Sequence, residues 1–586
     1  MTQKTTSDLA MTGRRILFAS LVAGTMIGML WLMASALSID GLSLGDIALL
    51  VLFFFTLPWM ATGFWNSTIG FLIWRFARDP LAAVMPMATG IDPSAPITNS
   101  TAILLCVRNE SPERSERNLN LLLQGLAQPG IAEHVHIYVL SDTNDETIAK
   151  LEQTCFDSLA QKWQGQINIT YRRRTDNTGY KAGNIADFCQ RWGHQHDFAI
   201  TLDADSVMTG AAIMRLVRIM QANPKLGLLQ GLVVGMPTTS GFTRMFQFGM
   251  RLGMRSYTIG TAWWQGDCGP YWGHNAVFRL APFITDCDLP LLQNKDGSTH
   301  HILSHDQVEA VLMRRAGFDV RVFPQEDESW EENPPTLIEY IRRDLRWCEG
   351  NLQYLQLLKL DNIKLISRIQ LLNAIFMFLG SPAWIGMLIL GTIMLALAST
   401  PAAFMHQSSG LTLLWLVIFM WYWPKFAGGL DVLIRRAQRN AFGGTTRFLT
   451  GFTLEMIFSI LMTPITWLNH AMFMCGLLFG KKSGWTGQTR EDHSVPFSIA
   501  IRQFWPHTLL GIFLISALAL THPECVTIAV ILLGGLTLSI PLAVMTSWPS
   551  FGRLLLRVGL FDIPEEITRP DALLQLDLAA YRSRPH

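Results

Sequence analysis

The stretch Phe198-Ala199-Ile200-Thr201-Leu202-Asp203-Ala204-Asp205-Ser206 decides the fold of the central part of this 586-residue chain. It opens with a short apolar run, the length of one buried strand, and ends in two carboxylates separated by one small residue. Ligands of open α/β sheets bind beyond the carboxyl ends of the strands, so we expect these acids at a ligand site. Their oxygens suit Mg2+ or Mn2+, which phosphates and water complete in nucleotide sites. An isolated Asp-x-Asp is more often a solvated turn or a helix N-cap, so the neighbouring motifs decide between the two interpretations.

Polar residues also follow two further predicted strands of this region. Residues 102–107 form a buried apolar run that Asn109 and Glu110 soon follow, and residues 135–140 form a second run that precedes Asp142. A helical pattern lies between the two runs. The order strand, helix, strand predicts a parallel doubly wound sheet with these side chains at one edge. Asp142 would accept hydrogen bonds from a nucleotide base or ribose, or else form an Asx turn.

A basic, glycine-containing segment lies between these strands and the two acids. It comprises residues 172–174, which are three arginines, and residues 179–184, which include Lys181. Glycines let the backbone and a lysine approach phosphates closely, and residues 182–191 continue as a helix. The arginines alone fit a solvated face. Because two carboxylates follow within about thirty residues, a nucleotide diphosphate with a divalent cation explains the whole pattern better.

The composition differs from that of an ordinary soluble enzyme. Apolar residues make up 49% and charged residues 16% of the chain, which has 19 Trp and 33 Phe. The net charge of +1 leaves no basic surplus for phosphates, so we expect no nucleic-acid partner. The eight cysteines contain no Cys-x-x-Cys pair, which argues against a zinc site and against a disulfide framework.

Apolar runs long enough to cross a bilayer flank the central region. Residues 16–37 and 47–74 predict a membrane hairpin, because arginines border its two ends and none lies between the runs. A cleavable signal peptide is the rival for the first run. The basic flanks place both ends in the cytoplasm. The predicted segments are a cytoplasmic N-terminus (1–15), a transmembrane hairpin (16–78), a cytoplasmic domain (79–365), a second transmembrane region (366–548) and a cytoplasmic tail (549–586).

The second transmembrane region has four clear spans and one ambiguous stretch. The spans are predicted at residues 371–398, 411–430, 507–521 and 526–545. Basic residues flank residues 448–480 on both sides, so this stretch crosses the membrane an even number of times. It forms either a tight hairpin bent near Pro464 or a helix that lies in the interface. The total is therefore six or eight spans.

The order of motifs resembles that of the processive family 2 glycosyltransferases of GT-A fold, the group that contains cellulose and hyaluronan synthases. The resemblance covers roughly residues 101–356 by motif and the remainder by membrane layout. Within this family, residues 328–335 and 343–353 are similar to the glucosyltransferases that make osmoregulated periplasmic glucans. The motifs are Arg108-Asn109-Glu110, Asp142, Lys181-Ala182-Gly183-Asn184, Asp203-Ala204-Asp205, Asp306 and Arg343-Asp344-Leu345-Arg346-Trp347.

The resemblance implies an α/β GT-A nucleotide-sugar-binding domain inserted in a polytopic α-helical membrane domain. It also implies roles for individual residues. The nucleotide-sugar would be bound by Asn109, Glu110, Asp142, Lys181, Asp203, Asp205, Arg343 and Arg346, and the metal by Asp203 and Asp205. Asp306 would be the general base on the acceptor hydroxyl, a group that this chemistry needs because a sugar hydroxyl is a poor nucleophile. Trp347, Trp272 and His274 would bind the acceptor.

Three features depart from the family pattern or leave alternatives open. His305 and Arg343 stand where cellulose synthase-like enzymes have Glu and Gln, and His305 would either orient Asp306 or cap the following helix. A buried structural Trp is the alternative for Trp347. Residues 481–503, with Trp485, Gln488, Arg490 and Asp492, resemble a gating loop over the nucleotide, with Arg490 as the gating residue. The alternative is an ordinary loop held by lipid headgroups.

The resemblance therefore implies an inverting glucosyltransferase of the bacterial inner membrane. It would use UDP-glucose with Mg2+ or Mn2+, extend a β-1,2-linked glucan and pass it across the bilayer. Its partners would be the growing glucan, the lipid bilayer, a periplasmic glucan-processing protein and further copies of the chain. A cellulose- or hyaluronan-type synthase is the enzyme alternative. A nucleotide-sugar sensor that docks other proteins is the alternative of another class.

Overall fold

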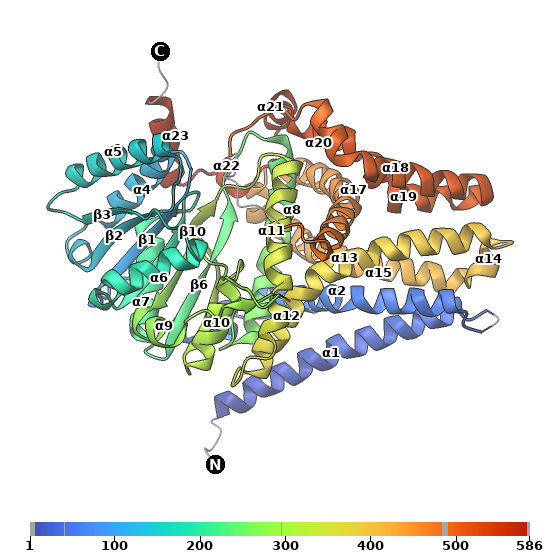
Figure 1. Ribbon diagram of the computed structural model, residues 1–586, viewed down its shortest axis with the longest axis horizontal. Helices are drawn as coiled ribbons and strands as arrows, with labels where there is room; N and C mark the ends of the chain where they lie inside the picture. Colours follow the sequence, from blue (N-terminus) through green and yellow to red (C-terminus); the bar gives the residue numbers. More distant parts are fainter. Residues whose placement is uncertain (1–5, 40, 295, 483–489, 583–586) are drawn as a thin grey trace.

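The computed structural model describes residues 6–39, 41–294, 296–482 and 490–582, and it joins an α/β domain to a set of long helices (Figure 1). The α/β domain lies between α2 and α13 in the sequence and occupies the left of the view, while the long helices extend to the right. The predicted α/β domain between two groups of membrane helices is therefore confirmed.

An eight-stranded sheet of order β3-β2-β1-β4-β7-β6-β10-β5 forms the centre of the domain. The first four strands in this order are parallel, as predicted. The other half is mixed, because β7 runs antiparallel to both β4 and β6. The strands are β1 (Thr101–Val107), β2 (Val135–Ser141), β3 (Asn168–Arg173), β4 (Phe198–Asp203), β5 (Val207–Met208), β6 (Leu226–Gly235), β7 (Ala276–Arg279) and β10 (Asp319–Glu331), beside a small pair of β8 (Leu292–Gln293) and β9 (Thr299–His300).

Helices cover both faces of the sheet, because its strands are apolar on both sides. One face packs against α4 (Pro112–Leu126), α5 (Glu146–Lys162) and α7 (Gly210–Ala222). The other packs against α6 (Tyr180–Trp192), α9 (Leu280–Asp286) and α10 (Asp306–Arg315). Strands β1, β2 and β4 therefore present their carboxyl ends at one edge of a three-layer domain.

Six helices are long and apolar enough to cross a membrane, and a bent pair would make a seventh span. The long helices are α1 (Thr6–Leu37), α2 (Leu44–Phe76), α13 (Leu365–Leu397), α15 (Gln407–Ile434), α17 (Thr445–Leu478) and α18 (Phe497–Thr521). The bent pair is α19 (Val526–Thr537) with α20 (Ser539–Ser547), which meet at 56°. All spans expected from the sequence thus fall on helices.

Helix α17 corrects one alternative for the ambiguous stretch. A hairpin bent near Pro464 is wrong, because α17 continues through this proline as one helix. Figure 1 views α17 nearly end-on, whereas α2 and α15 run across the view, so α17 lies crosswise to them. Phe448 near its start packs with Phe248 of the α/β domain, and Arg490 beyond its end bonds Asp205 of the same domain. This arrangement agrees with the alternative of a helix in the interface.

Helix α8 (Gly241–Gln265) connects the domain to the first membrane hairpin. It packs along α2 with the backbones almost in contact, since a Cβ at Gly70 would lie 1.7 Å from the Ser256 carbonyl oxygen. A Cβ at Gly260 would likewise lie 1.9 Å from the carbonyl oxygen of Asn66. Only glycine permits this approach. The α/β domain is therefore seated on the membrane helices by a helix of its own.

The remaining elements surround this junction. Helix α11 (Leu337–Leu352) crosses between the domain and the long helices, and α21 (Pro549–Val558), α22 (Pro564–Ile567) and α23 (Asp571–Arg582) return the chain to the α/β domain (Figure 1). The short helices are α3 (Pro80–Val84), α12 (Tyr354–Leu357), α14 (Pro401–Phe404) and α16 (Arg436–Ala441).

Candidate active site

A cavity of about 270 Å3 lies at the carboxyl edge of strands β1, β2 and β4, facing helix α11. Segments that are far apart in the sequence meet there. The predicted site residues that line it are Glu110, Asp142, Lys181, Asp203, Asp205, Trp272, His274, Asp306, Arg343, Arg346, Trp347 and Arg490. The sequence motifs therefore converge on one site.

Asp203 ends β4 at the edge of this cavity and has a lysine as its counter-ion. The ammonium group of Lys181 donates to Asp203 Oδ1 and, at 2.8 Å, to the carbonyl oxygen of Gly273. Burial alone would raise the pKa of Asp203, but Lys181 and then His274 and Arg490 leave the pKa below its ordinary value. Burial would also lower the pKa of Lys181, yet Asp203 leaves it raised. Both groups are therefore charged.

Asp205 has a counter-ion from a different part of the chain. Arg490 Nη1 donates to Asp205 Oδ2 and, at 2.9 Å, to the carbonyl oxygen of Glu332. Of the predicted gating loop, Trp485 and Gln488 lie outside the described residues, whereas Arg490 reaches the cavity and Asp492 accepts a hydrogen bond from Thr239. The segment after α17 is therefore bound to the carboxylate motif at Arg490.

The two carboxylates fit a divalent cation only together with ligands from a bound substrate. Among the described residues, His, Cys, Asp and Glu side chains form no group of three or more that would hold a metal. Mg2+ and Mn2+ in nucleotide sites take one or two carboxylates and complete their shell with phosphates and water. Asp203 and Asp205 match that donor set, with Lys181 and Arg490 now neutralising their charge.

Asp142 is held by the last of the three arginines at residues 172–174. Arg174 forms a two-pronged ion pair with it, Nε to Oδ1 at 2.5 Å and Nη2 to Oδ2 at 2.8 Å. Arg172 pairs with Asp187 and Arg173 with Glu146. Each guanidinium of this run therefore pairs with an acid, and none of the three arginines lines the cavity, whereas Lys181 does.

Asn109 does not line the cavity, although it precedes Glu110, which does. Its φ of +53° places it in the left-handed region, where asparagine is tolerated. Its side chain joins the loops after β1 and β2, because Oδ1 accepts from the backbone N–H groups of Asn144 and Asp145 at 3.2 Å. Asn109 thus shapes the loop that carries Glu110.

Asp306 is the first residue of α10 and faces the cavity beside Gly273. A Cβ at Gly273 would lie 3.4 Å from the Cβ of Asp306, and this glycine has a φ of +84°. The preceding His305 does not cap α10 with its side chain. Its Nδ1 instead lies 3.0 Å from Glu309 Oε1, and although burial opposes it, this acid raises the pKa of His305. The capping alternative for His305 is therefore wrong.

Helix α11 supplies the cationic and aromatic wall of the cavity. The Arg343 guanidinium lies 4.9 Å from the ring centre of Trp347, a distance suited to a cation–π contact. Burial, followed by repulsion from Arg490, Arg343 and Arg342, lowers the pKa of Arg346 to about 10. Trp347 is 47% exposed, so the alternative of a buried structural tryptophan is wrong.

Trp272 and His274 lie on the loop before β7, on the same side as the carboxylates. The backbone N–H of Trp272 donates to Gln230 Oε1 at 2.7 Å. His274 lies 3.5 Å from Ser206 Oγ, and Ser206 in turn accepts from the N–H of Asp203 at 3.1 Å. His274 therefore lies directly behind the Asp-x-Asp turn.

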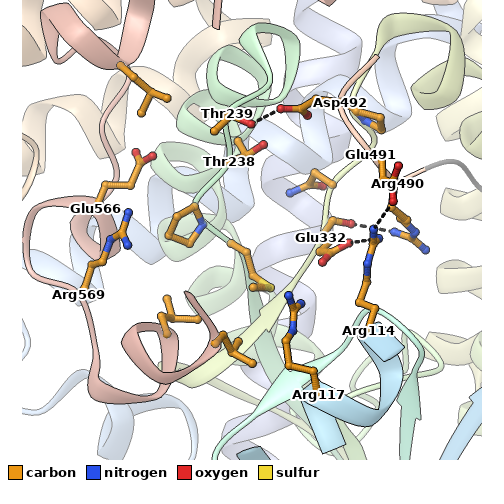
Figure 2. A pocket seen from close by; sticks show the side chains of 17 residues that line it. Arg114, Arg117, Thr238, Thr239, Glu332, Arg490, Glu491, Asp492, Glu566 and Arg569 are labelled. Carbon is orange, nitrogen blue, oxygen red and sulfur yellow. Dashed lines mark hydrogen bonds and ion pairs between the residues drawn. The ribbon is translucent and has the colours of Figure 1, made fainter. Parts of the chain in front are cut away.

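A second cavity, of about 630 Å3, lies on the other side of Arg490 (Figure 2). Sequence reasoning missed it. Figure 2 shows Arg114, Glu332 and Arg490 grouped on one side, with Glu566 and Arg569 of the C-terminal segment across the cavity. Arg114 Nη1 donates to Glu332 Oε2 at 2.9 Å. Because Arg490 lines both cavities, it separates the second cavity from the site at Asp205.

Glu110 leads to a testable pH dependence. Its burial raises its pKa to about 7, with Asp205 adding to the rise and Arg490 opposing it. A carboxyl with a raised pKa in the folded protein destabilises that protein at high pH, because ionisation is easier in the unfolded chain. The loss of stability grows as pH rises from the unfolded pKa of about 4.3 to the folded pKa. We therefore expect Glu110→Gln to raise the melting temperature of the nucleotide-free protein at pH 8 and to leave it unchanged at pH 4. The upper limit of this stabilisation is about 4 kcal/mol, at about 1.4 kcal/mol per pKa unit.

Melting curves at several pH values, recorded in one detergent, would check this expectation. Glu113→Gln is the matched control, because Glu113 lies three residues later, in the first turn of α4, and outside both cavities. Equal shifts of the two variants at pH 8 would contradict a special environment for Glu110.

The comparisons with known proteins agree with this geometry. The chain matches the models "Glycosyl transferase family 2" over residues 102–285 and "Glycosyl transferase family group 2" over residues 198–538. Glucans biosynthesis glucosyltransferase H of Xanthomonas oryzae pv. oryzae is 35% identical over 562 residues, which cover 93% of this chain and 86% of that protein. The proteins of the same name in Xylella fastidiosa and Pseudomonas entomophila are each 35% identical, and the matches cover 89% and 64% of their lengths.

One solved structure is also similar in part. The mannosyltransferase PcManGT from Pyrobaculum calidifontis, in complex with GDP-Man and Mn2+, matches 62% of this chain and 98% of its own. The TM-score is 0.40 at 13% sequence identity, a likeness too low to support an argument about the site.

Proposed function

Because the chain belongs to glycosyltransferase family 2 and has a GT-A-type domain between membrane helices, we propose that it uses UDP-glucose to polymerise a β-1,2-linked glucan. Its relatives named for glucan biosynthesis support a glucan as the product. The observation that carries the proposal is the convergence of Asp203, Asp205 and Asp306 on one cavity with Lys181 and Arg346. Three acids and several cations around one space suit the transfer of a sugar from a diphosphate.

In the proposed reaction, Asp306 accepts the proton of the acceptor hydroxyl as that oxygen attacks the anomeric carbon of the donor. The bond between the anomeric carbon and the diphosphate oxygen breaks, its electron pair leaves with UDP, and the configuration inverts. Asp203 and Asp205 would hold Mg2+ or Mn2+, whose charge supports the departing diphosphate. Lys181 and Arg490, which now neutralise these acids, would then face the phosphates.

Helix α11 would contribute to binding of both substrates. Arg343 and Arg346 are guanidinium groups with the planar geometry that phosphates favour. Although burial and the neighbouring arginines lower its pKa to about 10, Arg346 stays protonated at neutral pH, and an anionic ligand would offset the repulsion from those arginines. The exposed ring of Trp347 would stack on the apolar face of the acceptor sugar.

We further propose that the enzyme lies in the bacterial inner membrane with its domain in the cytoplasm and passes the glucan across. A periplasmic glucan-processing protein would receive the product, and the chain would assemble with copies of itself. Aromatic residues of the long helices are candidates for lining a path for the glucan, but two tryptophans have other surroundings. Trp415 is 62% exposed on the outside of the helices, which suits a membrane anchor. Trp467 stacks on Trp384 at 4.8 Å, so these rings form a closed cluster.

Turnover by the purified protein tests the proposal. In lipid nanodiscs with UDP-glucose and Mg2+, we expect release of UDP and a glucan whose methylation analysis gives 2-linked glucose. A 4-linked product would identify a cellulose-type synthase, and turnover with UDP-N-acetylglucosamine in place of UDP-glucose would indicate a hyaluronan-type enzyme. Nucleotide-sugar binding without turnover would identify a sensor.

A further inference from the structure

Asp344 of helix α11 is joined to helices α13 and α17 through a buried histidine. His470 of α17 places Nε2 at 2.7 Å from Asp344 Oδ2, and its Nδ1 lies 2.9 Å from the hydroxyl of Ser381 in α13. The ring of Phe378 meets the imidazole edge-on, with centres 5.0 Å apart and planes at 82°. His470 and Ser381 are 7% and 3% exposed, so these contacts are shielded from water.

The direction of the two hydrogen bonds follows from the carboxylate. An ionised carboxylate only accepts, so His470 Nε2 carries the hydrogen and donates it to Asp344. In the neutral ring Nδ1 is then an acceptor, and the Ser381 hydroxyl donates to it. Each hydrogen bond of the series Ser381–His470–Asp344 thus runs in the same direction, and the groups that face one another are all paired. Fully satisfied buried networks of this kind favour one geometry.

The neighbours of Asp344 in the sequence line the cavity of about 270 Å3 at Asp203 and Asp205, called the donor cavity below. Arg343 precedes it, and Arg346 and Trp347 follow two and three residues later. Successive residues of an α-helix differ by about 100° in direction, so one helix presents Arg343, Arg346 and Trp347 to the cavity and Asp344 to His470 of α17. The rotation and position of α11 therefore determine both its contact with His470 and the placement of its residues in the cavity.

We propose that His470 is a positioning residue that fixes α11 so that Arg343, Arg346 and Trp347 meet the substrates. The inference rests on the proposed function for the role of these three residues. Helices α13 and α17 would thus help to position the nucleotide site through α11, because each contributes one residue to the series. Loss of the series would weaken nucleotide binding without removing any group that touches the nucleotide.

Three variants separate positioning from general stability. His470→Phe keeps an aromatic ring against Phe378 and removes both hydrogen bonds. His470→Gln restores a donor toward Asp344, because its amide nitrogen takes the place of Nε2. His507→Phe is the matched control, since His507 of α18 is also fully buried and bonds a side chain of α17, Asn469, at 3.0 Å, but lies outside the donor cavity.

Two measurements on each full-length variant in nanodiscs decide the matter, namely the Kd of UDP with Mg2+ and hydrogen–deuterium exchange of residues 337–352. We expect His470→Phe to raise the Kd about tenfold and to speed exchange in α11 alone. His470→Gln should return both to within about threefold of the wild type, and His507→Phe should leave the Kd unchanged. In turnover, KM for the donor should rise more than kcat falls.

The outcomes distinguish this inference from the proposed function. If the wild type binds no nucleoside diphosphate, the proposed function fails, and the exchange of α11 still decides whether His470 holds that helix. An unchanged Kd in His470→Phe, or an equal rise in His507→Phe, would overturn the positioning role. If His470→Phe does not fold, Ser381→Ala takes its place, and an unchanged Kd and unchanged exchange in this variant would overturn the inference equally.

Discussion

Replacing Asp306 by asparagine should reduce kcat about 10²- to 10⁴-fold, the range over which a positioned general base acts. Asparagine has almost the same shape as aspartate but does not accept the proton of the acceptor hydroxyl. Asp306 is the first residue of α10 and faces the cavity beside Gly273, whereas Lys181 and Asp203 form their own pair on the donor side. The Kd of UDP should therefore stay within about twofold of the wild-type value.

Release of UDP under saturating UDP-glucose, together with calorimetric titration of UDP, would measure the two quantities separately. Asp296→Asn is the matched control, because Asp296 lies between β8 and β9, outside both cavities, and bonds only its neighbour Ser298 among the described partners. This variant should keep wild-type turnover. A loss of nucleotide binding in Asp306→Asn that matches its loss of kcat would contradict the role of a base.

The carboxyl ends of the strands were predictable because they depend on local patterns. Strands β1, β2 and β4 are continuous apolar runs followed by polar residues, and such runs have one interpretation in a buried parallel sheet. The mixed half of the sheet could not be predicted in this way. Strand β7 has four residues, and periodicity does not encode whether a strand runs parallel or antiparallel to its neighbour.

Counter-ions were the part of the site that the sequence concealed. Arg174 and Asp142 are 32 residues apart, and Arg490 and Asp205 are 285 apart, so no local spacing pairs them. A run of three arginines before a glycine-containing helix has the same appearance whether it binds phosphate or acids of the same domain. Only the fold, which brings β2 beside β3, shows that Asp142 and Arg174 meet.

Membrane layout was partly predictable for a similar reason. Basic flanks constrained residues 448–480 to an even number of crossings, but they did not distinguish a hairpin from a helix in the interface. Pro464 suggested a bend. A proline is tolerated inside a helix where neighbouring helices satisfy the freed backbone, and α17 packs against α8, α11, α13 and α19. The packing of α8 on α2 could not be predicted from the sequence, because its closest contacts come from two single glycines that are 190 positions apart.

Replacing Arg244 by methionine should destabilise the protein by about 3–5 kcal/mol, the usual loss when one member of a buried ion pair is removed. The Arg244 side chain is fully buried in α8 and binds the C-terminal segment at several points. Its Nη2 donates to Asp562 Oδ1 at 2.7 Å and to the carbonyl oxygen of Leu560 at 3.0 Å, and its Nη1 donates to Glu566. Methionine fills the space but leaves two buried acids without their cation.

The pH dependence of this loss identifies its cause. Burial already raises the pKa of Glu566, and Arg244 opposes that rise. Without Arg244 the folded pKa of Glu566 should rise further. The resulting loss of stability appears above the unfolded pKa of about 4.3 and vanishes below it, where Glu566 is protonated in both the folded and the unfolded protein. We therefore expect Arg244→Met to lower the melting temperature strongly at pH 8 and much less at pH 4.

Melting curves at the two pH values and limited trypsin digestion would measure the effect. Digestion should release the segment after α20 first, because Arg244 fixes it to α8. Arg215→Met is the matched control, since its guanidinium also pairs with an acid, Asp327, but its side chain is 53% exposed. Exposed pairs contribute about 0–1 kcal/mol, so this variant should melt close to the wild type. An equal loss in both variants, or a loss in Arg244→Met that does not depend on pH, would mean that missing packing rather than the uncompensated acids causes the destabilisation.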